Sequence, residues 1–527
     1  MPPNQNTMPP EFYLLLLSGR PGDVSHLSTE RRYNDVGPHL SGHPFLKDPD
    51  RLMNLLDALA AICVHKETKE VYFVSLAMDP NAVTLHVSSN ENVPATVATH
   101  LCKIRGQLKE LRKVLDIPPI PPDSETSPDP NKTQLRADHE FQLQRTIYEY
   151  SYRKLRQRFV KRAPAILDRF ETTTKKLQAS PEDAELLHLT HWYLKHIQDL
   201  LRNDKPTNSL TDLIQTIDEM SRAWWNHLNA AGKEDILTQW DDLLWESGLT
   251  FCIYEAITHV LLLGADQNRK WSLRCLLEKL FTLHHHIHTI THIAWSHRLL
   301  PFLQGQFTVV SVPASCWDIS LSFSPQNILP VIFPQGEQKE LPVYDELLKR
   351  LKEKLDKEEI TLKKGTNLSI KAAVHAECTL LVYHLQHPIP TPYHYLGGSK
   401  LSCHGCATLF SSFNLVAESF HSPQFFTKGC HNKIYLRWAC PSLLSPEQTK
   451  QLQPGTPSLD AGVRKEMIVA LSRELATYVN ELRTFTEGSS RPQSDSTAAS
   501  GDSREPPEAI ARSQMRARVE AAFAYNG

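Results

Sequence analysis

Two short stretches of the chain decide how its C-terminal part folds: Val-His-Ala-Glu at 374–377 and Ser-Cys-His-Gly-Cys at 402–406. Imidazole nitrogen and thiolate sulfur are ligands that zinc prefers in a tetrahedral site. A catalytic zinc keeps three protein ligands and leaves its fourth position to water. His375, Cys403 and Cys406 supply three ligands of these types. We therefore predict that these three residues hold one zinc ion.

The carboxylate of Glu377 follows His375 closely in the chain. Water bound to zinc loses a proton near neutral pH, and the resulting hydroxide attacks the carbon that carries an exocyclic amine. In the first turn of a helix, Glu377 would take that proton and pass protons to the ring nitrogen and the departing ammonia. An H-x-E motif followed by C-x-x-C is the arrangement of zinc deaminases. The predicted activity is hydrolytic deamination of a base in a nucleotide or nucleic acid.

The residues around the two motifs predict the elements that carry them. The pattern indicates a helix that begins at His375 and ends before Pro388 and Pro390, which cannot continue it. Residues 393–396 favour a strand, Gly397 and Gly398 a turn, residues from 401 onward a second helix, and 434–438 a second strand. Both thiolates would then lie in the first turn of a helix, where the helix dipole favours negative charge.

A zinc that only stabilises the fold is the alternative interpretation of the same residues. Such a site would need a fourth protein ligand, for which Cys378, His404, His394 and Cys430 are candidates. The chain would then be a non-catalytic binding or scaffold protein with a deaminase-like fold. The long helical segment before residue 306 would be its platform for a protein partner.

The match to known motifs extends beyond the metal ligands. Residues 399–406 are similar to an S-K-x-x-C-x-x-C motif, and residues 429–438 to a G-x-H-G-K-x-Y-x-x-W motif with Asn432 at the second glycine. Both motifs resemble those of the OTT-like deaminases of fungi and intracellular bacteria, within the cytidine-deaminase-like superfamily. Ser402 stands where the superfamily often has proline.

That resemblance implies an α/β fold: a three-layer α/β/α cytidine-deaminase-like domain. It also implies His375, Cys403 and Cys406 as zinc ligands, Glu377 as the acid/base, and a cytosine-type substrate. No strand is evident after Pro441, so a reduced version of the superfamily's sheet is expected.

Candidates for substrate binding lie near the second motif. His431 and Lys428 belong to a small basic loop, which is either a phosphate contact or a solvated loop. Tyr395 and Trp438 would stack on a base, because aromatic faces recognise flipped bases. Aromatic residues of strands more often pack in the core, which is the competing interpretation.

The rest of the chain divides into segments of different character. Residues 1–131 form a mixed region with a helix at 49–62, a β-hairpin of 71–76 and 82–87, a helix at 95–115 and a proline-rich linker at 117–132. Residues 132–305 have helical periodicity, 306–486 the deaminase-like domain, and 487–527 a disordered tail with a possible short terminal helix. Within 306–486 we expect strands at 307–312 and 319–323, a helix at 345–358, a strand-turn-strand at 360–372 and a helix at 461–486.

Histidines cluster between residues 284 and 297. His284, His288 and His292 share one face of the predicted helix and form either a second metal site or a surface that packs on other helices.

Composition limits the kinds of partner and compartment. Lys and Arg total 57 against 59 Asp and Glu, so no global positive field draws in nucleic acid and any such contact is local. Ten cysteines are too few for a disulfide scaffold, which favours a reducing compartment. The apolar run 12–17 has no basic segment before it, and no stretch reaches the ~18 apolar residues of a membrane span. We expect an intracellular protein, cytoplasmic or nuclear, that does not enter a membrane.

Overall fold

A computed structural model of the 527-residue chain describes residues 8–20, 29–30, 49–68, 70–79, 81–115, 130–160, 164, 167, 181–202, 209–230, 272–296, 299–333, 341–387, 391–451, 453 and 456–489. Two compact units are present, residues 1–480 and 481–527, and the second contains the end of the last helix. Most of the expected linker, Pro80 of the expected hairpin turn, His297 and the expected tail after residue 489 lie outside the described residues.

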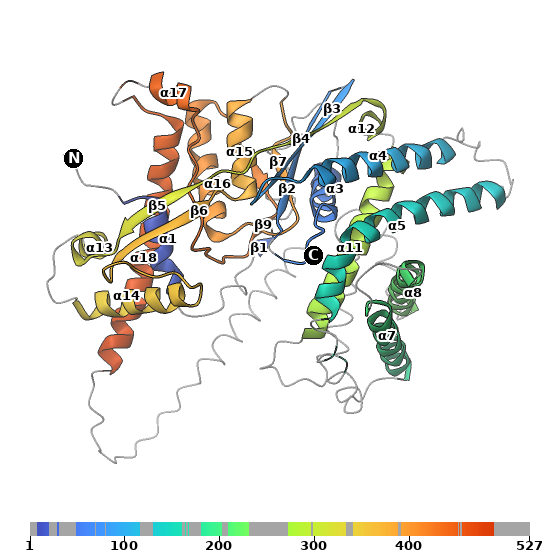
Figure 1. Cartoon of the computed structure of the whole chain (residues 1–527), viewed down its shortest axis with the longest axis horizontal. Coiled ribbons are helices and arrows are strands. Elements are labelled where there is room, and N and C mark those ends of the chain that lie inside the picture. Colours follow the sequence, from blue (N-terminus) through green and yellow to red (C-terminus); the bar gives the residue numbers. More distant parts are fainter. Residues whose placement is uncertain are drawn as a thin grey trace, which may run out of the picture. The chain divides into compact units, whose positions relative to one another are not determined.

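A five-stranded mixed sheet lies at the centre of the first unit, with strand order β4-β3-β2-β7-β8 (Figure 1). Its strands are β2 (Tyr72–Met78), β3 (Ala82–Ser89), β4 (Gln306–Ser311), β7 (Tyr395–Gly398) and β8 (Phe426–Thr427). β2 is antiparallel to β3 and to β7, whereas β3–β4 and β7–β8 are parallel. The sheet therefore joins strands from both sides of residue 306, where the sequence suggested a boundary.

Helices cover both faces of this sheet. Successive side chains of a strand point to opposite faces, so the contacts of β2 show which helices lie on which face. On β2, Tyr72, Val74 and Leu76 belong to the main hydrophobic core together with residues of α3 (Pro49–Ile62), α4 (Ala95–Leu115) and α11 (Ser272–Trp295). Ser75, which alternates with them, hydrogen bonds to His384 of α15 (Ala376–Gln386) on the other face. The α-helix of the first motif thus lies on one face, and the N-terminal helices lie on the other.

Further helices extend that N-terminal layer. α5 (Pro130–Val160) packs on α4, and α7 (Pro181–Leu200) packs on α8 (Ser209–Ala230). α12 (Leu300–Gln304) leads from α11 into β4. Arg105 of α4 fixes this connection, because its guanidinium donates to the backbone carbonyls of Phe302 and Leu303, each at 2.8 Å.

The remaining elements surround α15 and α16 (His404–Ala417). β5 (Cys316–Ser322) and β6 (Asn367–Ala373) form an antiparallel pair, and β1 (Thr29–Glu30) pairs with β9 (Gly429–Cys430). The other helices are α1 (Pro10–Ser18), α13 (Pro325–Ile332), α14 (Leu341–Asp356), the 3-10 turn η3 (Glu418–Phe420), α17 (Pro446–Gln451) and α18 (Leu459–Ser489). The apolar run at 12–17 is buried in α1, where Phe12 stacks on Phe323.

The structure is mixed α/β, as predicted, and several elements begin and end where the sequence indicated. The helices at 49–62 and 95–115 have the predicted bounds, and the 72–89 hairpin, the helix at 376–386 and the long helix at 459–489 are present. Among the described residues no helix is long and apolar enough to cross a membrane.

Three local predictions were wrong. Gly397 and Gly398, expected in a turn, are the last residues of strand β7. Glycine is needed at 397 because β7 passes so close to α3 that a side chain there would meet the backbone of Leu56. Residues 434–438 form no strand beyond a single bridge of Trp438 to Ala373, since the chain turns at 436–437. Residues 360–362 form no strand, because positive φ at Glu359 and Lys364 bends the chain, and β6 pairs with β5 instead.

As expected, no strand follows Pro441 in the described part of the chain. Three of the five strands of the sheet, β2, β3 and β4, come from earlier segments.

Candidate metal centre

The first turns of two helices meet at the candidate metal centre. His375 is the N-cap of α15, with φ −71° and ψ 156°, and Cys403 is the N-cap of α16, with φ −79° and ψ 170°. Cys406 lies in the first turn of α16. Helix N-termini present unpaired N–H groups and the positive end of the helix dipole, so this position favours anionic ligands such as thiolates.

The three predicted ligand atoms form a nearly regular triangle. Sγ of Cys403 lies 3.4 Å from Sγ of Cys406 and 3.4 Å from Nδ1 of His375, and the third edge, from Cys406 Sγ to His375 Nδ1, is 3.5 Å. A point at the centre of this triangle is ~2.0 Å from each atom, close to the ~2.0–2.3 Å bonds that zinc makes to nitrogen and sulfur. The residues present therefore fit a single ion of that size.

Burial makes a cation at this position chemically important. It raises the pKa of the thiols of Cys403 and Cys406 well above their ordinary value, so a cation is what would hold them as thiolates at neutral pH. Two donors support negative charge on sulfur. The indole Nε1 of Trp438 donates to Cys406 Sγ at 3.2 Å, and the backbone N–H of Cys406 donates to Cys403 Sγ at 3.4 Å.

Glu377 lies beside this triangle, in the first turn of α15, and is 2% exposed. Burial raises the pKa of the Cys406 thiol and of the Tyr435 phenol, and the charge of Glu377 raises both further. The carboxylate of Glu377 is therefore close enough to act on both the ligand cluster and the phenol of Tyr435. This is where a proton shuttle is needed if a substrate approaches over Tyr435.

Two aromatic rings, those of Tyr435 and His431, extend from the candidate ligand His375 toward the surface. The ring of Tyr435 packs edge-on against His375 with 5.5 Å between centroids, and His431 packs edge-on against Tyr435 at 5.9 Å. Burial lowers the pKa of His431 to about 4, and the charges of Lys433 and Lys400 contribute to this. Tyr435 is 49% exposed, so its ring borders solvent.

Tyr435 was not singled out from the sequence, although it lies in the second family-like motif. The four-residue spacing between His431 and Tyr435 does not by itself indicate a substrate site. It would do so only if the segment 431–435 were known to fold back on His375.

The other candidate substrate residues lie elsewhere. Tyr395 is 1% exposed, and its hydroxyl donates to Asp57 at 3.0 Å, so its ring lies in the core and has no open face. Trp438 is 3% exposed and contacts the candidate ligand Cys406 through its indole N–H. Lys428 lies near α11, where its charge contributes to lowering the pKa of His285 and His286 below the ordinary value, mainly through burial of those rings.

The candidate fourth ligands do not join the triangle. Among the described residues, the group of ligand atoms within 4.8 Å of one another contains only His375, Cys403 and Cys406. Cys378 comes nearest of the four candidates named from the sequence, because its thiol is hydrogen bonded to Cys406. Three ligands from the protein leave a position for a small molecule, as catalytic zinc sites require.

Residues of the N-terminal region fix both ligand-bearing helices. At the start of α15, Asn90 Oδ1 accepts from the backbone N–H of Ala376 at 3.0 Å, and the hydroxyl of Ser88 donates to the carbonyl of Ala376 at 2.7 Å. Before α16, Asp57 of α3 accepts from the backbone N–H of Gly398 at 2.8 Å. The sequence pattern of the two motifs does not reveal these contacts.

The histidine cluster of α11 forms no second metal site within the described residues. Burial lowers the pKa of His284 to about 3, and its ring packs edge-on against His288. The interpretation as a packed helix surface therefore describes His284, whereas His288 on the same face is exposed.

Comparison with known proteins agrees with the position of the site. Residues 374–442 match a family model described as OTT_1508_deam:-like deaminase. The matched segment begins one residue before His375 and contains all three ligands, Glu377 and Tyr435. No curated protein and no solved structure matches the chain in the corresponding comparisons.

Proposed function

We propose that this chain is a zinc-dependent hydrolytic deaminase of a base in a nucleotide or nucleic acid, with cytosine as the favoured base. The similarity of residues 374–442 to the family model of OTT-like deaminases supports the proposal. The observation that carries the proposal is the triangle of His375, Cys403 and Cys406 with a buried carboxylate beside it. We propose also that the central sheet, with helices on both faces, is that of the cytidine-deaminase-like fold.

His375, Cys403 and Cys406 would hold the zinc. Bound there, zinc would supply Lewis-acid chemistry that makes water a nucleophile near neutral pH. The helix N-termini at His375 and Cys403 and the indole N–H of Trp438 stabilise the charge of the thiolates, which keeps both sulfurs in the ligating form.

Glu377 performs the proton transfers in this proposal. Deamination replaces a C–NH₂ bond with C=O, consumes one water and releases ammonia. The carboxylate takes one proton from the attacking water and delivers it to the ring nitrogen. It then takes the second proton from the hydroxyl formed on the ring carbon and delivers it to the leaving amine, as the C–N bond breaks and C=O forms. Its position in the first turn of α15 holds it on the same side as the ligands without making it one of them.

Tyr435 and His431 bind the base. The half-exposed phenol ring of Tyr435 beside His375 offers a face or edge for stacking. Proteins usually hold an unpaired base, outside a nucleic-acid duplex, by stacking it on aromatic rings. With its pKa lowered to about 4, His431 is neutral at pH 7 and presents one donor and one acceptor to a substrate.

A product scan with the full-length chain tests the proposal. Wild-type protein, Glu377→Ala and the matched control Glu418→Ala, an exposed glutamate of η3, are incubated with cytosine nucleotides, RNA and single-stranded DNA. Mass spectrometry should find a gain of about one mass unit on the base with wild type and control. Glu377→Ala should bind zinc at the same ratio but form product at least ~100-fold more slowly.

Two results would overturn the proposal. Wild-type protein that binds one zinc yet converts no base in the panel would favour the scaffold interpretation, particularly if spectroscopy of cobalt-substituted protein showed no exchangeable ligand. Equal rates for Glu377→Ala and wild type would remove the carboxylate from the mechanism.

A further inference from the structure

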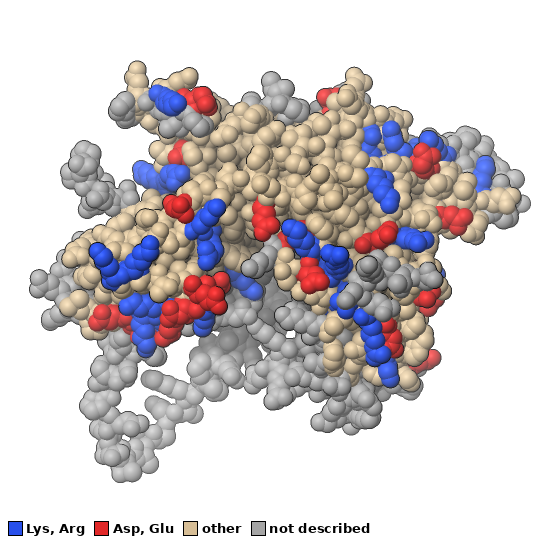
Figure 2. All heavy atoms as spheres, viewed as in Figure 1, with Lys and Arg blue, Asp and Glu red and all other residues tan. Residues whose placement is uncertain are grey.

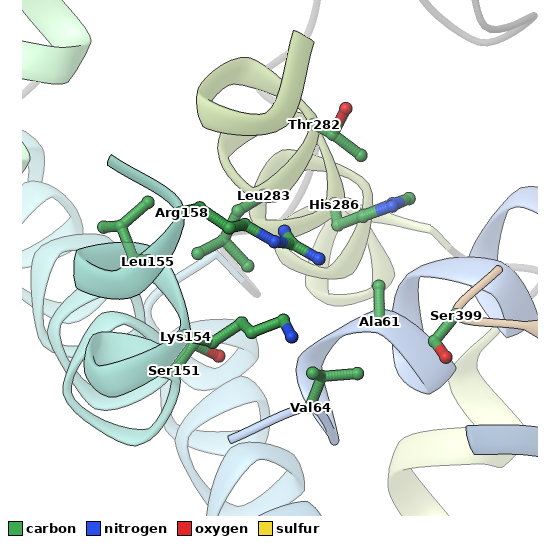
Figure 3. Close-up of a pocket in the computed structure, with 10 residues that line it drawn as sticks. All are labelled: Ala61, Val64, Ser151, Lys154, Leu155, Arg158, Thr282, Leu283, His286 and Ser399. Carbon is green, nitrogen blue, oxygen red and sulfur yellow. The ribbon is translucent and has the colours of Figure 1, made fainter. Parts of the chain in front are cut away.

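A small cavity separate from the metal ligands lies between α3, α5 and α11 (Figure 3). Its volume is about 140 Å³. The residues that line it lie on these three helices or directly after α3 and β7: Ala61, Val64, Ser151, Lys154, Leu155, Arg158, Thr282, Leu283, His286 and Ser399. None of them is acidic, whereas one lysine, one arginine and one histidine are present.

The two permanent cations of the cavity lie on one helix. Lys154 and Arg158 are four positions apart on α5 and share a face, and Figure 3 shows both side chains extending into the space between the helices. Like charges at this spacing repel each other, and an anion between them would reduce this repulsion. The ammonium of Lys154 also donates to the backbone carbonyl of Glu67. Both side chains are half-buried, which strengthens their interaction with a bound charge.

A buried hydroxyl points to the same kind of ligand. Ser151 lies one turn before Lys154 on α5, is 3% exposed, and its Oγ has no hydrogen-bond partner. A buried polar group without a partner costs stability, so such groups often wait for a water or a ligand. At the β7 end of the cavity, Ser399 accepts from the backbone N–H of Tyr72 at 2.9 Å, which leaves the hydroxyl hydrogen available to donate.

Positive charge continues from the cavity toward the second motif. Lys428 follows β8, and its charge acts on His286 of the cavity, whose pKa is lowered chiefly by burial. On the face drawn in Figure 2, basic and acidic side chains lie interspersed. The cavity is lined by basic side chains and by no acidic one.

The cavity and the metal centre share one short segment of chain. Ser399 lines the cavity and Cys403 ligates in the triangle, and four residues of fully extended chain span at most ~14 Å. Lys400, between them, acts electrostatically on His431, which packs against Tyr435 beside the metal ligand. A substrate whose base lies over Tyr435 would reach this cavity by following residues 399–403, and we adopt this path for the substrate.

We propose that the cavity of Ser151, Lys154, Arg158, His286 and Ser399 is a phosphate-binding subsite for the substrate, which rests on the proposed deaminase function. Its size limits the ligand to a group such as phosphate. A cavity of ~150 Å³ holds a molecule the size of benzene, whereas pockets for whole small-molecule ligands begin at ~300 Å³. The phosphate is that of a nucleoside monophosphate or of a neighbouring nucleotide in a single strand.

Calorimetry on a catalytically silent protein tests the subsite without relying on turnover. Inorganic phosphate is titrated into zinc-loaded full-length Glu377→Ala protein, alone and combined with Arg158→Gln, with Ser151→Ala, or with the control Arg153→Gln. Arg153 is an exposed arginine of the same helix that does not line the cavity. Loss of a charge-assisted hydrogen bond from Arg158 should weaken binding about 10-fold or more, and loss of the Ser151 hydroxyl about 3-fold or more. The control should bind as the parent does.

Folding of the variants is checked by their thermal midpoints. Ser151→Ala should be as stable as the parent or more stable, because the hydroxyl that it removes has no partner in the protein. Reduced phosphate binding by a variant of unchanged midpoint then reports on the cavity and not on unfolding.

Activity assays on proteins that retain Glu377 separate the two sources of phosphate. Rates are compared for cytidine, for cytidine 5′-monophosphate and for a short oligocytidylate without terminal phosphates. Arg158→Gln should raise KM for one or both phosphorylated substrates about 10-fold and leave cytidine unchanged. An effect on the monophosphate alone identifies a terminal phosphate, and an effect on the oligonucleotide alone identifies the backbone.

Failure of the subsite and failure of the enzyme are distinguishable. Absence of phosphate binding, or equal binding by Arg158→Gln and Arg153→Gln, overturns the subsite even if deamination is observed. Phosphate binding that depends on Arg158 and Ser151 supports a phosphate site even if no base is deaminated, and that result contradicts only the proposed function.

Discussion

The segments 374–442 and 49–115 contribute to the same site in opposite ways. The first contains all three candidate metal ligands, Glu377 and Tyr435, and it contributes only the short strands β7 and β8 to the central sheet. The second has none of these groups, yet it supplies the long central strands β2 and β3 and the helices that cover one face. The candidate ligands and the strands and helices that support them thus come from different parts of the sequence.

Contacts between the two segments show what this division means. Asp57, Ser88 and Asn90 of the first half hold the backbone at Gly398 and Ala376, immediately before or at the starts of the ligand-bearing elements. The geometry of the candidate ligands is therefore set partly by residues that are not themselves in the ligand triangle. Variants at the contacts between the two segments should consequently lower stability, whereas variants beside the candidate ligands should lower metal or substrate affinity.

The largest effect is expected where the two segments touch most closely. A Cβ added at Gly397 would lie 2.3 Å from the backbone carbonyl carbon of Leu56, so β7 and α3 must move apart. We predict that Gly397→Ala lowers the free energy of unfolding by about 3 kcal/mol, as overpacking of a core does. Denaturant titration measures it.

Gly106→Ala in α4 is the control for this substitution. Nothing lies within 4 Å of a Cβ built at Gly106, so alanine should stabilise the helix by about 0.5–1 kcal/mol. Equal stability of Gly397→Ala and wild type would show that the contact between the segments is looser than described.

A smaller effect is expected inside segment 374–442. Trp438→Phe keeps an aromatic ring but removes the N–H that donates to Cys406 Sγ, and loss of such supporting hydrogen bonds lowers metal affinity about 10–100-fold. Chelator competition measures the affinity. Trp192→Phe, at a 53% exposed position of α7, should leave it unchanged. Unaltered affinity in Trp438→Phe would mean that the indole only fills space.

The smallest effect sharpens the contrast between two tyrosines. Tyr395→Phe removes one of the hydrogen bonds that Asp57 accepts and should cost about 1 kcal/mol of unfolding free energy, with KM unchanged. Tyr435→Ala should leave stability nearly unchanged and raise KM, because its ring is half-exposed beside His375. Thermal unfolding and steady-state kinetics on both variants check this, and a raised KM in Tyr395→Phe would contradict the assignment of that ring to the core.

Local patterns predicted the elements well where one segment alone decides them. The helices at 49–62 and 95–115 follow from apolar periodicity, and the helix after His375 ends at residue 386, before Pro388, as its sequence indicated. The predictions failed where a distant segment decides. Gly397 is extended because α3 packs on it, and residues 434–438 turn after β9, so that Trp438 reaches Cys406 and Tyr435 reaches His375.

The sequence by itself determined which atoms can bind a metal, because the identity of a ligand and its place in a helical first turn are local properties. Only the tertiary structure decided that two strands from the N-terminal segment complete the sheet, that Tyr435 borders the site while Tyr395 is buried, and that Lys154 and Arg158 share a cavity with Ser399. The physical reason is that strand pairing and side-chain burial depend on contacts between residues hundreds of positions apart, which no local periodicity records.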